Sequence, residues 1–238
     1  MRPALRALGF EFCAGSPYRP AVNPLGYLVT VLVAYLLGSI PTGYLVARAR
    51  GIDIRAVGSG NIGATNVFRI LGKPAGIFVL TADALKGWLS VVVVAGFCAD
   101  YFGGAGAGSS PAGEWLRIAG GIAAILGHNY TCWLQFKGGK GIATSAGVFL
   151  ALGPKAFLIA LAAWLVVFAV SRFVSLASIA AAVALPLGAW ASGSSHAVTG
   201  ISAAVGALAI YKHKANIQRL RAGTESRVGK KKDETPKA

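Results

Sequence analysis

The stretch FLIALAAWLVVFAV, residues 157–170, is an unbroken apolar run without a single charge. Comparable blocks with few or no charges recur at residues 29–37, 77–94, 118–126, 179–190 and 198–211. Runs of this kind are typical of membrane-spanning helices, because lipid offers no hydrogen-bond partner to an open backbone. The pattern predicts an all-α protein: a polytopic integral membrane bundle of helices.

The overall composition supports the same class. Of the 238 residues 55% are hydrophobic and only 13% are charged, whereas a soluble domain has about 25% charged residues. So few charges cannot cover the surface of a soluble globule. The 32 glycines suit helices that pack closely in lipid, where small residues allow neighbouring backbones to approach.

The net charge of +15 would suggest nucleic acid as a partner for a soluble protein. Here the basic residues cluster at the ends of the apolar blocks and in the tail after Lys212. No basic and aromatic surface pattern accompanies them, so we expect no nucleic-acid binding and interpret the charges as cytoplasmic flanks and a tail facing an anionic leaflet. The three cysteines have no metal-ligand spacing, and neither a metal nor a disulfide framework is expected.

About seven transmembrane helices are predicted. Their ranges are 25–47, 75–99, 115–134, 142–152, 155–171, 173–190 and 196–211. The fourth is too short to span a bilayer, so two of the seven are short or re-entrant, and a five-span version with a re-entrant hairpin at 142–171 stays open. Both versions place the basic connections on one side, which puts the C-terminus in the cytoplasm and the N-terminus outside; Arg2, Arg6 and Arg19 are exceptions to this distribution.

Four parts of the chain follow from this division. Residues 1–23 are expected to form a loosely ordered extension rather than a cleaved signal peptide, since Arg6 and Glu11 interrupt its apolar character. Residues 24–212 form the transmembrane domain, and residues 213–225 the cytoplasmic end of the last helix. Residues 226–238 form a disordered basic tail.

The motif GSGNIGATN, residues 58–66, matches G-x-G-x-x-G, with Asp83 twenty positions after Gly63. This spacing is the outline of a dinucleotide-binding fingerprint. That site requires a strand–turn–helix unit, whereas no second strand is available here and Asp83 lies in a predicted span. NAD binding is therefore rejected. The motif is interpreted instead as a loop whose backbone N–H groups approach an anion, with a flexible linker as the alternative. The residues assigned to it are Gly58, Ser59, Gly60, Asn61, Gly63, Thr65, Asn66 and Arg69.

A second motif, FKGGKG at 136–141, precedes the short apolar block. A helix N-terminus with nearby lysines is suited to phosphate, so Lys137, Gly138, Gly139, Lys140 and Gly141 are candidate phosphate-binding residues. The P-loop pattern fails, because glycine follows Lys140 and Leu134 stands where the first glycine is needed. Ordinary cytoplasmic flanking lysines are the alternative.

A third motif, HKANIQRLRAGTE at 213–225, has His213 and Asn216 three positions apart, on one helix face if the last span continues into the cytoplasm. By itself this segment would be interpreted as a solvated basic tail.

Asp83 and Lys86 are expected to form a structural ion pair within their span. Ser175 and Ser178 are, from residue type alone, interhelical hydrogen-bonding groups.

No acyltransferase base dyad of the form H-x-x-x-x-D is present. The fifth residue after each histidine is Trp133, Ile201 or Gln218. Phosphate-binding groups without a strong base suggest that an activated, anionic substrate does part of the work. The alternatives are a small transporter or channel for an anionic solute, which the lack of an inverted repeat disfavours, and a non-enzymatic membrane scaffold.

Six segments together resemble one known family. They are GSIPTGYL (38–45), GSGNIGATNVFRILG (58–72), DALKG (83–87), GHNYTCWLQFKGGKGIATSAG (127–147), RFVSLASI (172–179) and HKANIQRLRAGTE (213–225). In this order they resemble the bacterial acyl-phosphate:glycerol-3-phosphate acyltransferases, the PlsY family, over about residues 25–225. Thr131 departs from the family, which usually has proline there, and Tyr130 and Trp133 replace phenylalanines.

The resemblance implies transfer of an acyl chain from acyl-phosphate to the 1-hydroxyl of sn-glycerol-3-phosphate. The products would be lysophosphatidic acid and phosphate, in the first step of bacterial phospholipid biosynthesis. It also implies a multi-pass protein of the bacterial inner (cytoplasmic) membrane, an active site facing the cytoplasm, no cofactor, and a functional link to a phosphate acyltransferase that makes the acyl-phosphate. Carried onto this sequence, the catalytic residues are Ser59, Arg69, Lys140, Ser178, His213 and Asn216.

Overall fold

The computed structural model describes residues 22–104 and 106–229, and within these ranges all regular structure is helical. The prediction of an all-α chain is confirmed for this part. Among the described residues, four helical segments are long and apolar enough to cross a membrane: Pro24–Arg48, Lys73–Gly103, Pro154–Ser171 and Val174–Ala191. The predictions for residues 1–21 and 230–238 lie outside the described residues.

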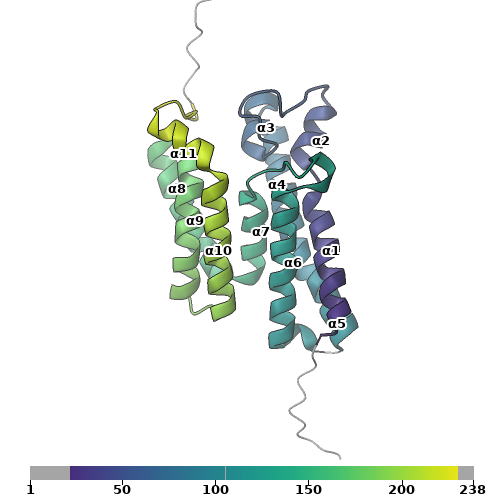
Figure 1. Cartoon of the computed structure of the whole chain (residues 1–238). Helices are drawn as coiled ribbons and strands as arrows, with labels where there is room; N and C mark the ends of the chain where they lie inside the picture. Colours follow the sequence, from purple (N-terminus) through teal and green to yellow (C-terminus); the bar gives the residue numbers. More distant parts are fainter. Residues whose placement is uncertain (1–21, 105, 230–238) are drawn as a thin grey trace, which may run out of the picture.

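The helices form two groups (Figure 1). The first group contains α1 (Pro24–Ser39), α2 (Thr42–Arg48), α3 (Ala64–Leu71), α4 (Lys73–Leu89), α5 (Ala95–Gly103) and α6 (Pro111–Asn129). A π-helical stretch, Ser90–Val94, joins α4 to α5 without a break.

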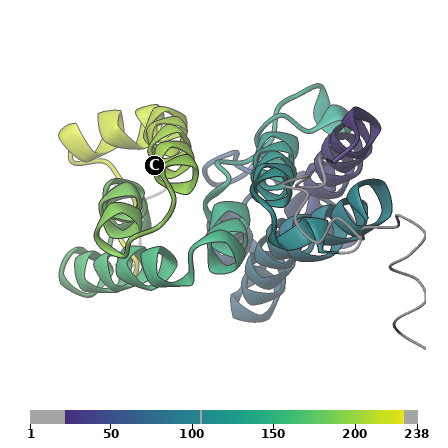
Figure 2. The same cartoon turned by 90° about the horizontal axis from the view of Figure 1, so that it is seen from below.

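The second group contains α8 (Pro154–Ser171), α9 (Val174–Ala191), α10 (His196–Lys212) and α11 (Lys214–Arg221). The short helix α7 (Ile142–Leu152) lies between the groups, as the view along the bundle in Figure 2 shows. Its first turn therefore lies where the two groups face each other.

Small residues allow the closest helix contacts, as their abundance predicts. A Cβ added at Gly38 would overlap the backbone of Ala124, which brings α1 against α6. A Cβ at Gly147 would overlap the backbone of Ala84, so α7 lies directly against α4. The contact between Gly147 and Ala84 fixes the position of α7 relative to the first group.

The predicted first span, 25–47, is not one continuous helix. It breaks at Ile40 and Pro41, between α1 and α2. Proline disfavours the helical conformation of the residue before it and cannot donate a backbone hydrogen bond. At the break the carbonyl of Ile40 accepts a hydrogen bond from Thr42 N at 3.0 Å in place of a helical bond.

Three further expectations need correction. The glycine-rich connection at 51–74 contains a helix, α3, whose apolar side packs on α4 through a cluster that includes Val67, Ala75 and Val79. The last span does not continue straight to Asn216, because α10 ends at Lys212 and α11 begins at Lys214 after a change of direction at His213.

Residues 226–229, assigned to the tail, bond back to the bundle: Val228 N donates to the carbonyl of Arg172 at 3.0 Å.

Candidate active site

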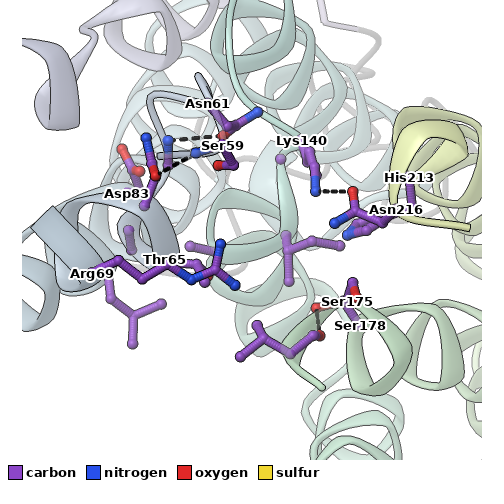
Figure 3. Close-up of a pocket in the computed structure, with 18 of the residues that line it drawn as sticks. Ser59, Asn61, Thr65, Arg69, Asp83, Lys140, Ser175, Ser178, His213 and Asn216 are labelled. Atoms are coloured by element: carbon purple, nitrogen blue, oxygen red, sulfur yellow. Dashed lines mark hydrogen bonds between the residues drawn. The ribbon is translucent and has the colours of Figure 1, made fainter. Parts of the chain in front are cut away.

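One polar cavity of about 110 Å³ lies where the two helix groups face each other. Segments from all three motifs line it, although they are far apart in the sequence. The predicted site residues on its wall are Ser59, Asn61, Gly63, Thr65, Asn66, Arg69, Lys140, Gly141, Ser178, His213 and Asn216. Figure 3 shows Arg69 and Lys140 reaching into the space between the two groups.

The first motif is a loop held in shape by Asn66. The Asn66 Oδ1 accepts a hydrogen bond from Ser59 N at 3.0 Å, and its Nδ2 donates to the carbonyls of Ile54 and Val57 at 3.2 and 3.1 Å. Gly58, with φ of 64°, adopts the left-handed conformation, and a Cβ there would overlap Asn66. The Asn66 amide is thus already occupied within the protein, so it shapes the loop rather than offering a free group to a substrate. Gly58 and Gly60 turn the chain without lining the cavity.

The loop leads into α3, which presents its polar side to the cavity. Asn61 Oδ1 accepts a hydrogen bond from Gly63 N at 2.9 Å, which sets the turn before the helix. Thr65 and Arg69 are four residues apart and therefore share one helix face. Both side chains line the cavity and remain exposed, so a solute can reach them.

The second motif is a loop, residues 138–141, bonded to the end of α6. Gly138 N donates to the carbonyl of Asn129 at 3.2 Å, and Gly139 N donates to the carbonyl of His128 at 3.0 Å. The structure therefore turns Gly138 and Gly139 toward α6 rather than toward the cavity. Lys137 is exposed and does not line the cavity.

Lys140 is the central charge of the site. Its Nζ donates a hydrogen bond to Asn216 Oδ1 on α11. Burial is the main factor that lowers the pKa of Lys140 to about 8, and the nearby Arg219 and Arg69 lower it further while Glu225 opposes them. Its ammonium is protonated at neutral pH, close to the second cation Arg69. Such a pair is suited to phosphate groups.

The third motif supplies a neutral histidine. His213 Nδ1 lies 2.7 Å from the carbonyl of Ala209, so Nδ1 carries the proton and Nε2 is the acceptor nitrogen. Burial, followed by the charge of Lys140, lowers the pKa of His213 to about 4. The ring is uncharged at neutral pH and can accept a hydrogen bond from a substrate hydroxyl.

Glu225 completes the third motif, although its role was not recognised from the sequence. Its side chain is 4% exposed and accepts bonds from Asn216 Nδ2 at 2.7 Å, Ser175 Oγ at 2.8 Å and Arg219 Nε at 2.7 Å. Burial raises the pKa of this carboxyl, but these three donors outweigh burial and lower it overall. The sequence feature that could have indicated this role is the position of Glu225 at the end of the motif HKANIQRLRAGTE.

Ser178 stands at the border between the cavity and a second, apolar groove. Its Oγ donates to the carbonyl of Val174 at 2.8 Å and accepts a bond from Trp164 Nε1 at 3.3 Å. Ser178 and Ile142 line both spaces. The groove runs between α7, α8, α9 and α10, and includes Phe149, Phe157, Leu161, Ala182, Leu185, Val205 and Gly206.

Two further polar side chains, Asp83 and His128, line the cavity from the first helix group. The predicted pair is confirmed: Lys86 Nζ lies 2.8 Å from Asp83 Oδ1. Within residues 22–104 and 106–229, no three His, Cys, Asp or Glu side chains are grouped as a metal site.

Comparison with known proteins assigns this arrangement to a family. The family model of glycerol-3-phosphate acyltransferase matches residues 28–223. A glycerol-3-phosphate acyltransferase of Geobacter sulfurreducens is 48% identical over 205 residues, 85% of this chain and 98% of the relative. Another, of Geobacter metallireducens, is 53% identical over 195 residues, 82% of this chain and 93% of the relative.

Solved structures agree with the sequence comparison. The crystal structure of PlsY, an integral membrane glycerol 3-phosphate acyltransferase, in its glycerol 3-phosphate form is 42% identical, with a TM-score of 0.75 over 85% of this chain and 96% of that one. Its lysophosphatidic acid form gives 41% identity and a TM-score of 0.73, over 85% and 95% of the chains. With most of its length matched in sequence and in fold, the chain belongs to the glycerol-3-phosphate acyltransferase family, as a multi-pass membrane protein.

Proposed function

We propose that this protein acylates the 1-hydroxyl of glycerol-3-phosphate with an acyl-phosphate donor and releases lysophosphatidic acid and phosphate. The observation that carries the proposal is the junction of the two spaces. A cationic cavity and an apolar groove meet at Ser178 and Ile142. A donor with an anionic head and a fatty tail fits both at once, and its reacting carbonyl would then lie at the junction.

The cavity has groups for the phosphates of both substrates. Arg69 is a permanent, bidentate cation, and Lys140 a point charge. Two anions repel each other in solution, and cations placed on both sides of the cavity reduce that repulsion and hold the substrates in one orientation. The predicted phosphate-binding role thus falls on Ser59, Asn61, Thr65, Arg69, Lys140 and Gly141, all of which line the cavity.

The chemistry requires little from the protein. The 1-hydroxyl oxygen attacks the acyl carbonyl carbon, the bond from that carbon to the phosphate oxygen breaks, and the departing phosphate takes the hydroxyl proton. A neutral His213 can orient the hydroxyl through Nε2. Because the donor is a mixed anhydride, its phosphate is both a good leaving group and an available base, which accords with the missing H-x-x-x-x-D dyad.

We place the cavity on the cytoplasmic side of the bacterial inner membrane. Basic residues flank the connections that form it, including Arg48, Arg50 and Lys137, whereas the opposite connection at 100–114 has none. Glycerol-3-phosphate would enter from the cytoplasm, and the donor would arrive through the lipid from a phosphate acyltransferase. Seven crossings, with α7 as the short one, fit this placement.

The donor is tested with protein purified in detergent. Palmitoyl-phosphate and palmitoyl-CoA are each supplied with labelled glycerol-3-phosphate, and labelled lysophosphatidic acid is measured. We expect product from palmitoyl-phosphate alone. Product only with palmitoyl-CoA would refute the proposed donor, and no product from either would favour transport of an anionic solute, measured by uptake into sealed vesicles.

A further inference from the structure

Three buried polar side chains lie beneath the 138–141 loop without a role in the reaction described above. They are Asp83 and Lys86 on α4 and His128 near the end of α6, exposed by 2%, 4% and 6%. We call these three residues the polar support. Charged groups inside a membrane bundle are costly and persist where they hold a specific arrangement.

The ion pair of the polar support joins α4 to the broken first span. Lys86 Nζ lies 2.8 Å from Asp83 Oδ1 and also donates to the carbonyl of Ile40 at 3.0 Å. That carbonyl stands at the break before Pro41 and also accepts a hydrogen bond from Thr42 N at 3.0 Å. Lys86 therefore ties α4 to the backbone of the break between α1 and α2.

His128 connects this pair to the loop that carries Lys140. Its Nδ1 lies 3.7 Å from Asp83 Oδ1, an electrostatic contact rather than a hydrogen bond. On the other side, a Cβ at Gly139 would overlap the His128 imidazole. The His128 carbonyl also accepts the bond from Gly139 N at 3.0 Å. The loop therefore packs against the His128 ring and also forms a hydrogen bond with the His128 carbonyl.

The next residue along α6 extends the same contact. The carbonyl of Asn129 accepts bonds from Gly138 N at 3.2 Å and from Lys212 Nζ on α10 at 3.2 Å. A displaced α6 end would therefore move the loop relative to α10 and α11, where Lys140 meets Asn216. Displacements of about 0.5 Å are enough to weaken a preorganised site.

The Asp83 carboxylate of the polar support also faces the site, because Asp83 lines the same cavity as Lys140. While Lys86 is present, it compensates the Asp83 carboxylate. Without Lys86, an unpaired carboxylate would face the phosphate substrates and repel them. Without Asp83, the remaining cation would not repel an anion. The two members of the pair therefore have unequal effects on anion binding.

We propose that Asp83, Lys86 and His128 are positioning residues that hold the 138–141 loop in place and keep the cavity free of uncompensated negative charge. This inference rests on the proposed function, since it assigns the loop to a phosphate of that reaction. It differs from a purely structural role because the sign of the charge left behind determines the effect on glycerol-3-phosphate affinity.

The test compares Lys86→Met, Asp83→Asn, the double variant and His128→Gln, with Lys73→Met as the control for loss of an exposed cation on the same helix. Each is purified in detergent and checked for its melting temperature. The Kd for glycerol-3-phosphate is measured by calorimetry without donor, followed by KM and kcat. Lys86→Met is expected to raise Kd and KM about tenfold, a typical coupling between neighbouring groups, with a smaller change in kcat.

The other variants give graded outcomes. Asp83→Asn should raise Kd less than Lys86→Met does, and the double variant should recover part of the loss. His128→Gln should raise Kd, and Lys73→Met should leave it unchanged. Equal effects of both single variants with no recovery in the double variant, or an unchanged Kd in folded His128→Gln, would overturn the proposal.

If Lys86→Met fails to fold, Lys86→Arg and His128→Gln carry the test. Arginine keeps the charge and should preserve Kd, whereas an unchanged Kd in His128→Gln again contradicts the role. Because Kd is measured without any donor, failure of palmitoyl-phosphate as a substrate in the wild type counts against the proposed function alone.

Discussion

The Nζ of Lys140 donates a hydrogen bond to Oδ1 of Asn216, a residue 76 positions later in the chain. This bond joins the loop before α7 to the start of α11 and so connects the two helix groups across the cavity. Glu225 fixes the other end of the same amide, because it accepts the bond from Asn216 Nδ2 at 2.7 Å. Asn216 therefore orients Lys140 from a rigid position.

Substitution of Asn216 tests that relationship. Asn216→Leu keeps a similar volume but removes the acceptor for Lys140, so the ammonium loses its fixed direction. We expect kcat/KM to fall about tenfold to a hundredfold, the range for loss of a partner that orients a functional group. Steady-state kinetics of the purified variant measure this loss, and Gln218→Leu, on the exposed side of α11, is the matched control. A rate within twofold of the wild type would contradict the role given to Asn216.

The pKa of Lys140 predicts an alkaline limit to activity. Burial lowers this pKa from its ordinary value to about 8, so the charged form that attracts phosphate predominates below pH 8 and is lost above it. We expect kcat/KM to be level up to about pH 7, to be roughly halved near pH 8, and then to fall up to about tenfold for each further pH unit. His213, with a pKa of about 4, stays neutral throughout this range.

Lys140→Arg provides the control for the pH profile, because arginine stays charged at all these pH values. Its maximum activity should be lower, since the geometry differs, but the fall above pH 8 should be absent. An unaltered alkaline limb in Lys140→Arg would assign that titration to another group.

Glu225 is predicted to matter for stability as well as for activity. Glu225→Ala leaves Asn216, Ser175 and Arg219 without their acceptor, and an unsatisfied buried group costs about 1–3 kcal/mol. We expect a lower melting temperature in detergent together with reduced kcat/KM. Glu225→Gln, which keeps an acceptor oxygen for one donor, should lie between the wild type and Glu225→Ala in both measurements. A melting temperature equal to that of the wild type in Glu225→Ala would be inconsistent with these bonds.

The apolar groove predicts a selective defect toward the donor. Ala182→Phe would fill the groove between α9 and α10 and should raise KM for palmitoyl-phosphate at least about tenfold, because the added ring takes space from the chain. KM for glycerol-3-phosphate should not change. Leu187→Phe, at an exposed position of the same helix, should leave both values unaltered. Equal changes for the two substrates would show that the groove does not hold the acyl chain.

Continuous apolar runs and the placement of charges were enough to predict helical structure, because each apolar run is a local feature of the sequence. The break at Ile40 and Pro41 was visible as a proline but could not be located within a span without its neighbours. Helix α3 was missed because it has only eight residues and lies between Gly63 and Gly72 in a glycine-rich segment. Its apolar side is buried only when α3 folds back on α4, the next helix, through a cluster that includes Val67, Ala75 and Val79.

The same difference between local sequence features and tertiary structure applies to the site. Arg69 and Lys140 were candidates from their own motifs, whereas His213 and Asn216 were assigned through the family resemblance, because their segment alone indicates a solvated basic tail. Whether a group faces the cavity depends on tertiary structure, and for that reason Lys137, Gly138 and Gly139 lie elsewhere while Glu225 and His128 lie at the site. The hydrogen bonds that already occupy Asn66 could not be predicted from its spacing in the loop.

The stoichiometry of the two products tests the proposed acyl transfer from acyl-phosphate. Purified protein is incubated with palmitoyl-phosphate and glycerol-3-phosphate, and both lysophosphatidic acid and inorganic phosphate are quantified over time, for the wild type and for Lys140→Ala. We expect equal amounts of lysophosphatidic acid and phosphate from the wild type, because each transfer releases one phosphate. The rate for Lys140→Ala should be at least about a hundredfold lower. Lysophosphatidic acid without matching phosphate, or a Lys140→Ala rate close to that of the wild type, would contradict the proposal.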